Sequence, residues 1–284
     1  MVEFQVPEVD YTRYSNRQLA AVPLAVLVLA LLVLAGWWLT TGAPVTPGIE
    51  FTGGTEMRIQ TTASQAEIEQ SLNPVSIAPA QSADNVYIVT FQETNTQALE
   101  SQAQQQGYEV TSVQSTSASF GANSQELALY GLAAAFVGMS ILVFLMFRTF
   151  VPSIAIVISA FSDIVIPLAL MNIFGIKLSL GTVAALLMLI GYSVDSDILL
   201  NNHILRRSGD FYESTYRAMR TGVTMTLTSI SAMTVMALVA FFFGIDLLTS
   251  IGVVLVLGLA TDLMNTYMLN LSLLRWYKYE GIAR

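Results

Sequence analysis

Six stretches of roughly twenty residues with almost no charge decide what this chain can fold into. They span residues 19–40, 127–147, 151–174, 178–204, 223–245 and 247–274. A helix needs about 20 apolar residues to cross the hydrocarbon core of a bilayer, so each stretch predicts a membrane-spanning helix. The first is longer than the apolar part of a signal peptide, so we expect it to be retained. The chain is therefore predicted to be a polytopic α-helical membrane protein with a polar segment after its first helix.

The residue types present narrow the chemistry. Charged residues make up 11% of the chain, against about 25% in an ordinary soluble domain, which excludes a soluble globular protein. Cysteine is absent, which excludes a disulfide framework, a thiolate metal site and a catalytic thiol. The single histidine excludes a histidine-based zinc or haem site. We therefore expect no metal, no cofactor, no catalytic residues and no enzyme activity.

The positions of Lys and Arg predict the topology. If the N-terminus is inside, the outside segments hold only Arg58 and Lys177, and the other basic residues lie in inside segments. Cytoplasmic segments carry the excess of Lys and Arg in membrane proteins. We therefore expect residues 1–18 and 275–284 to be cytoplasmic and residues 41–126 to form an extracellular domain of a cell-membrane protein.

The predicted extracellular segment is strongly acidic. Between Thr41 and Glu126 the acidic side chains are accompanied by one basic residue, Arg58. Nucleic-acid binding needs clustered Lys and Arg, so this class of partner is excluded. Dense negative charge with few lysines favours a high-salt environment, where the charge is screened and keeps the protein solvated. An ordinary acidic extracellular domain is the alternative.

The same segment has a readable order of elements. Alternation and residue propensity predict strands over 55–61, 75–78, 85–91 and 108–113, with helices over 63–72 and 95–106. The order β-α-β-β-α-β is that of a small ferredoxin-like α+β domain. Residues 115–123 are expected to be a polar linker back to the membrane.

Carboxylates inside the apolar stretches are the first candidate functional residues. They are Asp163, Asp195, Asp197 and Asp262. Each costs about 2.5–3.5 kcal/mol at the centre of a bilayer, so a functional role is the first hypothesis. The alternative is that a buried Asp serves as a neutral hydrogen-bond donor between helices.

The helix predicted over 178–204 is polar on two faces. Positions two apart on a helix point to nearly opposite sides, because each residue turns the chain by about 100°. One face carries Asp195 with Tyr192, Leu199 and Asn202, and the other carries Asp197 with Ser193 and Asn201. We therefore expect this helix to be central, between other helices of the chain and a partner.

The helix predicted over 223–245 continues a polar stripe that begins before it. Arg220, Thr224, Thr228 and Ser231 recur at helical spacing. An Arg level with carboxylates makes their protonation responsive to small movements, so Arg220 with Asp195 and Asp197 is a candidate ion or proton switch. Two alternatives are that the hydroxyls only bond across helix contacts and that Arg220 snorkels to the interface.

Three motifs resemble those of the SecD/SecF family. Their residues are most similar to those of the SecF group within it. Gly48-Ile-Glu-Phe-Thr-Gly-Gly-Thr55 looks like the signature that opens the external domain of the family, although a glycine turn is its simplest physical reading. Gly191-Tyr-Ser-Val-Asp-Ser-Asp197 is similar to the fourth-helix segment of SecF, and Arg220-Thr221 with the Ser/Thr run after it to the fifth-helix segment. The motifs occur in the order of the family. The acidic composition is most like that of haloarchaeal members. The junction residues that match are Gly48, Phe51, Gly53, Gly54 and Thr55.

The resemblance implies a fold, partners and a function. It implies one six-helix half of a unit of the resistance-nodulation-division (RND) superfamily, with SecD supplying the other half. It also implies association with a SecYE-type channel, the translocating polypeptide and membrane lipid, and assistance to protein export by an ion-motive force. The coupling role would fall on Asp195, Asp197 and Arg220. In the bacterial pattern the fourth-helix carboxylate stands at the position of Ser196, which here lies between two Asp residues.

Other functions remain open from the sequence. One alternative is half of an RND exporter of small molecules or lipids, although the short segment 41–126 leaves little room for a substrate cleft. Another is a structural subunit of the translocon without ion coupling. An intramembrane aspartyl protease would need two facing carboxylates, and the motif expected for that pairing is absent from the sequence.

Overall fold

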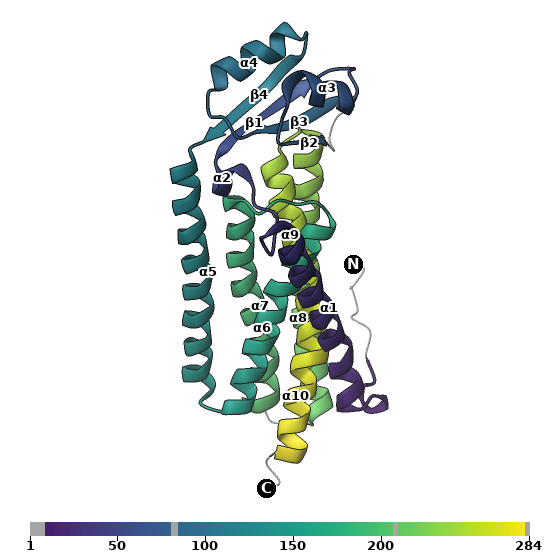
Figure 1. Ribbon diagram of the computed structural model, residues 1–284. Coiled ribbons are helices and arrows are strands. Elements are labelled where there is room, and N and C mark those ends of the chain that lie inside the picture. The colour runs from purple at the N-terminus through teal and green to yellow at the C-terminus, as the bar shows by residue number, and fades with distance from the viewer. Residues whose placement is uncertain (1–8, 81–84, 207–209, 282–284) are drawn as a thin grey trace.

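The computed structural model describes residues 9–80, 85–206 and 210–281. A bundle of long helices carries a small sheet domain at one end (Figure 1). We call the opposite end of the bundle the far end. Asp84, Arg207 and Arg284, which entered the charge arguments, lie outside the described residues, as do residues 1–8 of the predicted cytoplasmic N-terminus.

The long helices confirm the prediction of a six-helix membrane protein. Within the described residues, six helices are long and apolar enough to cross a membrane. They are α1 (Asn16–Thr41), α5 (Ala118–Phe147), α6 (Phe150–Ile173), α7 (Leu180–Arg206), α8 (Phe211–Phe242) and α9 (Asp246–Met264). The last span continues through η2 (Asn265–Asn270), α10 (Leu271–Trp276) and η3 (Tyr277–Gly281).

Two helices begin well before the apolar stretches that predict them. Helix α5 starts at Ala118, inside the expected linker, because the Ser117 side chain accepts a hydrogen bond from the Phe120 N–H. Helix α8 starts at Phe211 rather than near residue 223, because the Asp210 side chain caps it through the Tyr212 N–H. Hydropathy marks the part of a helix that suits the membrane, whereas the capping residue sets where the helix begins.

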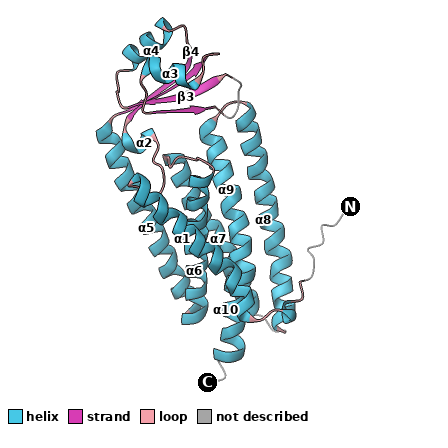
Figure 2. Cartoon of the chain, turned by 45° about the vertical axis from the view of Figure 1, so that its right-hand side comes forward, coloured by secondary structure: helices cyan, strands magenta, loops and turns pink. Residues whose placement is uncertain are grey.

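The sheet domain has the predicted ferredoxin-like order. It comprises β1 (Gly54–Gln60), α3 (Gln65–Leu72), β2 (Ser76–Pro79), β3 (Val86–Phe91), α4 (Thr96–Gln105) and β4 (Glu109–Thr116). The strands are antiparallel in the order β2-β3-β1-β4. Helices α3 and α4 cover the face of the sheet away from the bundle (Figure 2). Met57, Ile59 and Val89 from the strands pack against Ile68 and Leu99 from the helices, so alternate strand residues form the core of this domain.

The membrane helices differ in how much of their surface is covered. Helix α7 packs against α5, α6, α8 and α9, as its two polar faces led us to expect. Helices α5 and α8 lie at the outside of the bundle and expose large apolar side chains, such as Leu145 and Phe242. Such surfaces suit lipid or the helices of another protein.

An arginine near the end of the chain ties the N-terminal segment to the far end of the bundle. The buried Arg275 donates from Nε to Asn16 Oδ1, from Nη1 to the Tyr11 carbonyl at 2.9 Å and from Nη2 to the Tyr14 carbonyl at 2.7 Å. Burial raises the pKa of Tyr11 to about 12. Its hydroxyl therefore stays protonated at neutral pH and donates to Met219 Sδ at 3.6 Å. One guanidinium thus holds the start of α1 against α10.

We expect Arg275→Ala to lower the free energy of unfolding by about 3 kcal/mol, because it removes three hydrogen bonds and leaves the buried Tyr11 carbonyl without its donor. Arg275→Lys should recover only part of the loss, since an ammonium group lacks the planar fork of donors. Thermal unfolding in mild detergent, followed by circular dichroism, measures both. The exposed Arg17 at the same end is the control. Equal destabilisation by Arg17→Ala and Arg275→Ala would contradict this account.

Candidate functional site

The last membrane span widens where it crosses the core of the bundle. Helix α9 gives way to the π-helical segment η2, Asn265–Asn270. Its polar residues Asn265, Thr266 and Asn270 are fully buried. A π-helical turn changes the side chains that a helix presents to its neighbours and is frequent at functional sites.

Asp163 is held from two other helices. It lies on α6 and is 1% exposed. Its Oδ2 accepts from Ser193 Oγ on α7 at 2.6 Å, and its Oδ1 accepts from Asn265 Nδ2 on η2 at 2.6 Å. Both carboxylate oxygens are therefore satisfied by neutral donors, which joins α6, α7 and η2 at one point.

Asp197 and Asp262 share a hydroxyl group. Thr266 Oγ1 lies 2.8 Å from Asp197 Oδ1 and 3.2 Å from Asp262 Oδ1. Asn270 Nδ2 also donates to Asp197, at 2.8 Å, and Ser196 Oγ lies 2.8 Å and 3.0 Å from the two oxygens of Asp262. A hydroxyl has one proton to donate, so Thr266 serves one of the two carboxylates at a time.

These side chains form two hydrogen-bonded groups, which are joined where Ser196 Oγ donates to the Ser193 carbonyl at 2.9 Å, and we call the whole the carboxylate network. Its members are Asp163, Ser193, Ser196, Asp197, Asn201, Asp262, Asn265, Thr266 and Asn270. Among the described residues, no Lys, Arg or His forms an ion pair or hydrogen bond with its carboxylates. Unpaired buried charge is very costly. Neutralising this negative charge would therefore stabilise the network.

The structure separates the candidate residues into two groups. Asp163, Asp197, Asp262, Ser193, Ser196 and Asn201 belong to the carboxylate network. The remaining candidates are exposed on α7 and α8, and we call them the outer polar face: Asp195, Asn202, Arg220, Thr224, Thr228 and Ser231. The division of α7 follows its two predicted faces.

The expected switch between Arg220 and the carboxylates is not formed inside this chain. In the part of the chain that the structure describes, no ion pair joins Arg220 to Asp195 or Asp197. The physical reason is orientation, because Arg220 faces outward whereas Asp197 is fully buried. Asp195 is also exposed, on the opposite side of α7 from Asp197.

The hydroxyls of the outer polar face bond to their own helix. Thr224 Oγ1 donates to the Arg220 carbonyl at 2.7 Å, Thr228 Oγ1 to the Thr224 carbonyl at 3.0 Å and Ser231 Oγ to the Leu227 carbonyl at 2.8 Å. Such back-bonding is common for Ser and Thr in membrane helices. These residues present a surface of small side chains rather than a set of ligands, and their hydroxyls bond within α8 rather than across helix contacts as the packing alternative expects.

Sequence reasoning missed the three residues of η2 that complete the network. Asn265, Thr266 and Asn270 supply donors to all three carboxylates. A signal was present, since Thr266 and Asn270 follow Asp262 at intervals of four, which places them along one helical stripe.

The glycine motif at residues 48–55 is a structural joint. Phe51 lies on the short helix α2 (Ile49–Thr52) and is buried. Gly53 and Gly54 have φ of 75° and 115°, a region that favours glycine. Thr55 Oγ1 donates to the Glu93 carbonyl at 2.6 Å. The motif connects the membrane helices to β1 through close backbone contacts.

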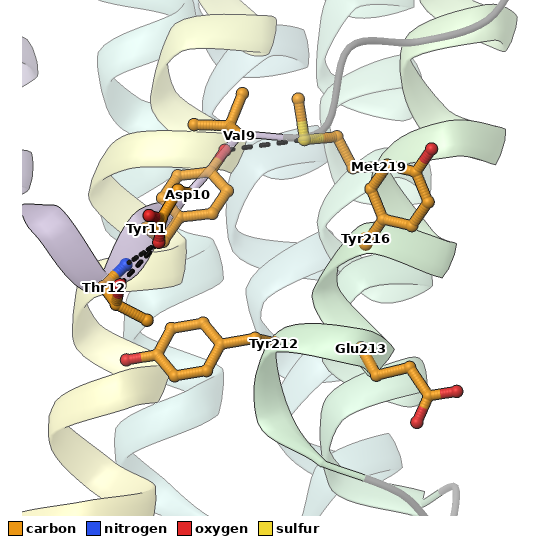
Figure 3. Close-up of a pocket in the computed structure, with 8 residues that line it drawn as sticks. All are labelled: Val9, Asp10, Tyr11, Thr12, Tyr212, Glu213, Tyr216 and Met219. Carbon is orange, nitrogen blue, oxygen red and sulfur yellow. Dashed lines mark hydrogen bonds between the residues drawn. The ribbon is translucent and has the colours of Figure 1, made fainter.

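A cavity at the far end is not a candidate catalytic site. It has a volume of about 410 Å³ and lies between the segment before α1 and the start of α8 (Figure 3). Its lining residues are Val9, Asp10, Tyr11, Thr12, Tyr212, Glu213, Tyr216 and Met219. Its two carboxylates already have partners, because Asp10 binds Thr12 and Arg13 and Glu213 pairs with Arg217. No nucleophile paired with a base lies in this cavity.

Sequence comparison relates the chain to protein-export membrane proteins. Residues 96–280 match the family described as protein export membrane protein SecD/SecF, C-terminal. The protein-export membrane protein SecF of Haloferax volcanii is 69% identical over 289 residues, and that of Haloquadratum walsbyi is 65% identical over 292 residues. Both alignments cover 100% of both chains. SecF of Methanolacinia petrolearia is 42% identical over 274 residues, covering 96% of this chain and 97% of that protein.

Structural comparison supports the fold. The crystal structure of SecDF, a translocon-associated membrane protein from Thermus thermophilus, superposes with a TM-score of 0.72 over 96% of this chain, at 18% identity. The super-membrane-facing form of SecDF gives a TM-score of 0.58 over 100% of this chain, at 20% identity. The chain spans only 39% and 40% of those two solved chains.

Proposed function

This chain belongs to the SecD/SecF family of protein-export membrane proteins, and we propose that it is an auxiliary subunit of the Sec translocase that assists export of polypeptides. The observation that carries this function is the match along the whole chain to SecF of two haloarchaea. In this role the chain makes and breaks no covalent bonds. A SecYE-type channel, the exported polypeptide and membrane lipid are the partners that follow from it.

The proposed orientation places the sheet domain outside the cell and both termini in the cytoplasm. An even number of spanning helices puts the two ends of the chain on one side of the membrane. Basic residues gather at the far end, where Arg13, Arg17, Arg217, Arg275 and Lys278 lie, and cytoplasmic segments carry such an excess.

We assign the outer polar face to contact with SecD. Asp195 and Arg220 are exposed on helices that cross the membrane, and a charge that faces lipid costs up to about 2.5–3.5 kcal/mol, the value at the centre of the bilayer. A second six-helix half would cover both and provide partners for them. The SecDF chain from Thermus thermophilus is long enough for such a half, because this chain covers 39% of it.

The carboxylate network is the proposed site of ion coupling. Its carboxylates come from α6, α7 and α9, so adding or removing protons or a cation changes the attraction between those helices. Thr266 can donate to Asp197 or to Asp262 but not to both, which provides two arrangements of the same core. Arg220 and Asp195 act at the SecD contact rather than inside this network.

The partner assignment predicts the result of a pull-down from native membrane in mild detergent. The tagged wild-type chain should recover SecD, identified by mass spectrometry as a second six-helix protein. An Asp195→Leu/Arg220→Leu variant should recover at least about tenfold less SecD. Removing each charge leaves the group of SecD that pairs with it without a partner. Glu213→Gln/Arg217→Gln, which removes an exposed ion pair on the same helix α8, is the control. Recovery of the wild-type chain without SecD would contradict the proposed complex. Unchanged recovery of SecD by the double leucine variant would show that SecD contacts another surface.

A further inference from the structure

Charged side chains join the sheet domain to the outer ends of the membrane helices. Arg58 on β1 and Lys177 in the loop before α7 are the two basic residues of the segments predicted to lie outside. Both are used at this junction rather than on the free surface of the domain. The other charges of the domain are acidic, so basic side chains could pair with many carboxylates elsewhere on it. Their position at the junction therefore concentrates the attraction between opposite charges there.

Arg58 binds the turn between α8 and α9. Its Nη1 donates to the Gly244 carbonyl at 2.9 Å, and its Nη2 pairs with Asp246. Gly244 follows the last turn of α8, and Asp246 is the first residue of α9. The Arg58 side chain is 21% exposed. One guanidinium therefore holds both ends of the α8–α9 turn, with the fork of donors that a lysine lacks.

Glu50 binds the start of α7. It lies on α2, and its carboxylate accepts a hydrogen bond from the backbone N–H of Leu180, the first residue of α7. A carboxylate is favourable at a helix N-terminus, where unpaired N–H groups and the helix dipole meet it. Two backbone hydrogen bonds of 2.8 Å support the contact, from Gly48 to the Leu178 carbonyl and from Leu178 to the Thr46 carbonyl.

Lys177 adds a third, weaker contact to the same surface. Its Nζ lies 3.6 Å from Glu56 on β1 and 3.4 Å from Thr90 Oγ1 on β3. The sheet of the domain therefore meets the loop before α7 and the α8–α9 turn on one face. Figure 2 shows this face of the sheet directed toward the bundle.

The helices gripped in this way are those that carry two carboxylates of the network. Helix α7 bears Asp197, and α9 bears Asp262. The remaining carboxylate, Asp163, lies on α6, which ends before the loop that carries Lys177. A displacement of α7 relative to α9 at the network would therefore change the two points on which the domain rests.

We infer that Arg58 and Glu50 are positioning residues, which clamp the sheet domain onto the α8–α9 turn and the start of α7. Because of this clamp, the domain moves as a rigid body with these helices. The clamp stands on the contacts alone, whereas the transmission of movement rests on the proposed ion coupling. The domain then tilts with the bundle instead of swinging on a flexible linker.

The absence of cysteine in the chain makes the clamp directly measurable. Spin labels are placed at Gln97→Cys, exposed on α4, and Phe242→Cys, exposed at the outer end of α8. Electron–electron double resonance is then recorded on the full chain with its partners in nanodiscs. We expect one narrow distance distribution. Arg58→Ala combined with Glu50→Ala should broaden it by about twofold or more, because the domain gains freedom to open locally. The control Arg217→Ala, which breaks an exposed ion pair at the far end, should leave it narrow.

Two further conditions separate the clamp from general electrostatics and from unfolding. In about 1 M KCl, where the Debye length is about 3 Å, the wild-type distribution should stay narrow, because the Arg58 contacts are direct and include a hydrogen bond to the Gly244 carbonyl. Protease resistance of residues 54–116 shows that the domain of each variant is folded. A broad wild-type distribution, or a narrow one in the folded double variant, overturns the clamp. A broadened distribution with normal export overturns the transmission of movement and leaves the proposed export function standing.

Discussion

A Gly54→Ala variant is expected to lose the native attachment of its sheet domain. Gly54 has φ of 115°, a conformation that is strained for any side chain. A Cβ atom at this position would overlap the Phe91 carbonyl oxygen, which belongs to the backbone of the paired strand β3 and cannot rotate away. Strain and overlap together should cost roughly 4 kcal/mol, enough to disrupt the start of β1.

Gly107→Ala provides the matched comparison. Gly107 also has positive φ, 78°, but nothing lies within 4 Å of the Cβ position, so only about 1 kcal/mol of backbone strain is expected. Gly131→Ala in α5, likewise in open space, should be neutral. Limited proteolysis of the chain in membranes, followed over time, reports cleavage within residues 54–116. Equal resistance of the Gly54→Ala and Gly107→Ala variants would show that the close approach to Phe91 does not matter.

Replacing both Asp197 and Asp262 by Asn is expected to slow protein export by about tenfold or more, equivalent to a rise of about 1.4 kcal/mol or more in the activation free energy. Asn has nearly the size of Asp, so the core of the bundle keeps its packing, but an amide cannot exchange a proton or neutralise a cation. The two arrangements of Thr266 would then no longer depend on the ion. A pulse-chase secretion assay in cells that carry the variant as their sole copy measures the rate.

The controls for this experiment address folding and position. Ser140→Ala removes a hydroxyl that donates to the Phe136 carbonyl within α5 and should leave export unchanged. Asp195→Asn removes a carboxylate on the outer polar face and should lower the amount of SecD that the tagged chain recovers. Immunoblots of membranes establish that each variant accumulates normally. Normal export by the Asp197→Asn/Asp262→Asn variant at normal abundance would favour the structural subunit without ion coupling.

Local patterns in the sequence were sufficient for the architecture. Apolar length identified the spanning helices, and strand alternation identified β1 and β3, because both depend on neighbours along the chain. The 100° turn per residue also placed Asp195 and Asp197 on different faces of α7, and the structure has one exposed and the other buried. Helix starts were less accurate, since Ser117 and Asp210 cap α5 and α8 within polar sequence that hydropathy does not detect.

The composition of the site could be predicted only in part. Burial logic selected Asp163, Asp195, Asp197 and Asp262, helical spacing added Arg220, and the resemblance gave the coupling role to Asp195, Asp197 and Arg220. The structure groups Asp163, Asp197 and Asp262 and leaves Asp195 and Arg220 on the outside. Periodicity states which face of a helix a residue occupies, but it does not state which neighbour that face meets.

The sequence by itself thus determined the number of membrane helices, the order of the sheet domain and the two faces of α7. Only the tertiary structure decided that Asp163, Asp197 and Asp262 lie in one network and that the π-helical segment Asn265–Asn270 supplies donors to them. It also decided that Arg58 and Glu50 bind the α8–α9 turn and the start of α7. The physical reason is that transfer into lipid is a property of each segment alone. The pairing of buried polar groups depends instead on how all the helices pack together.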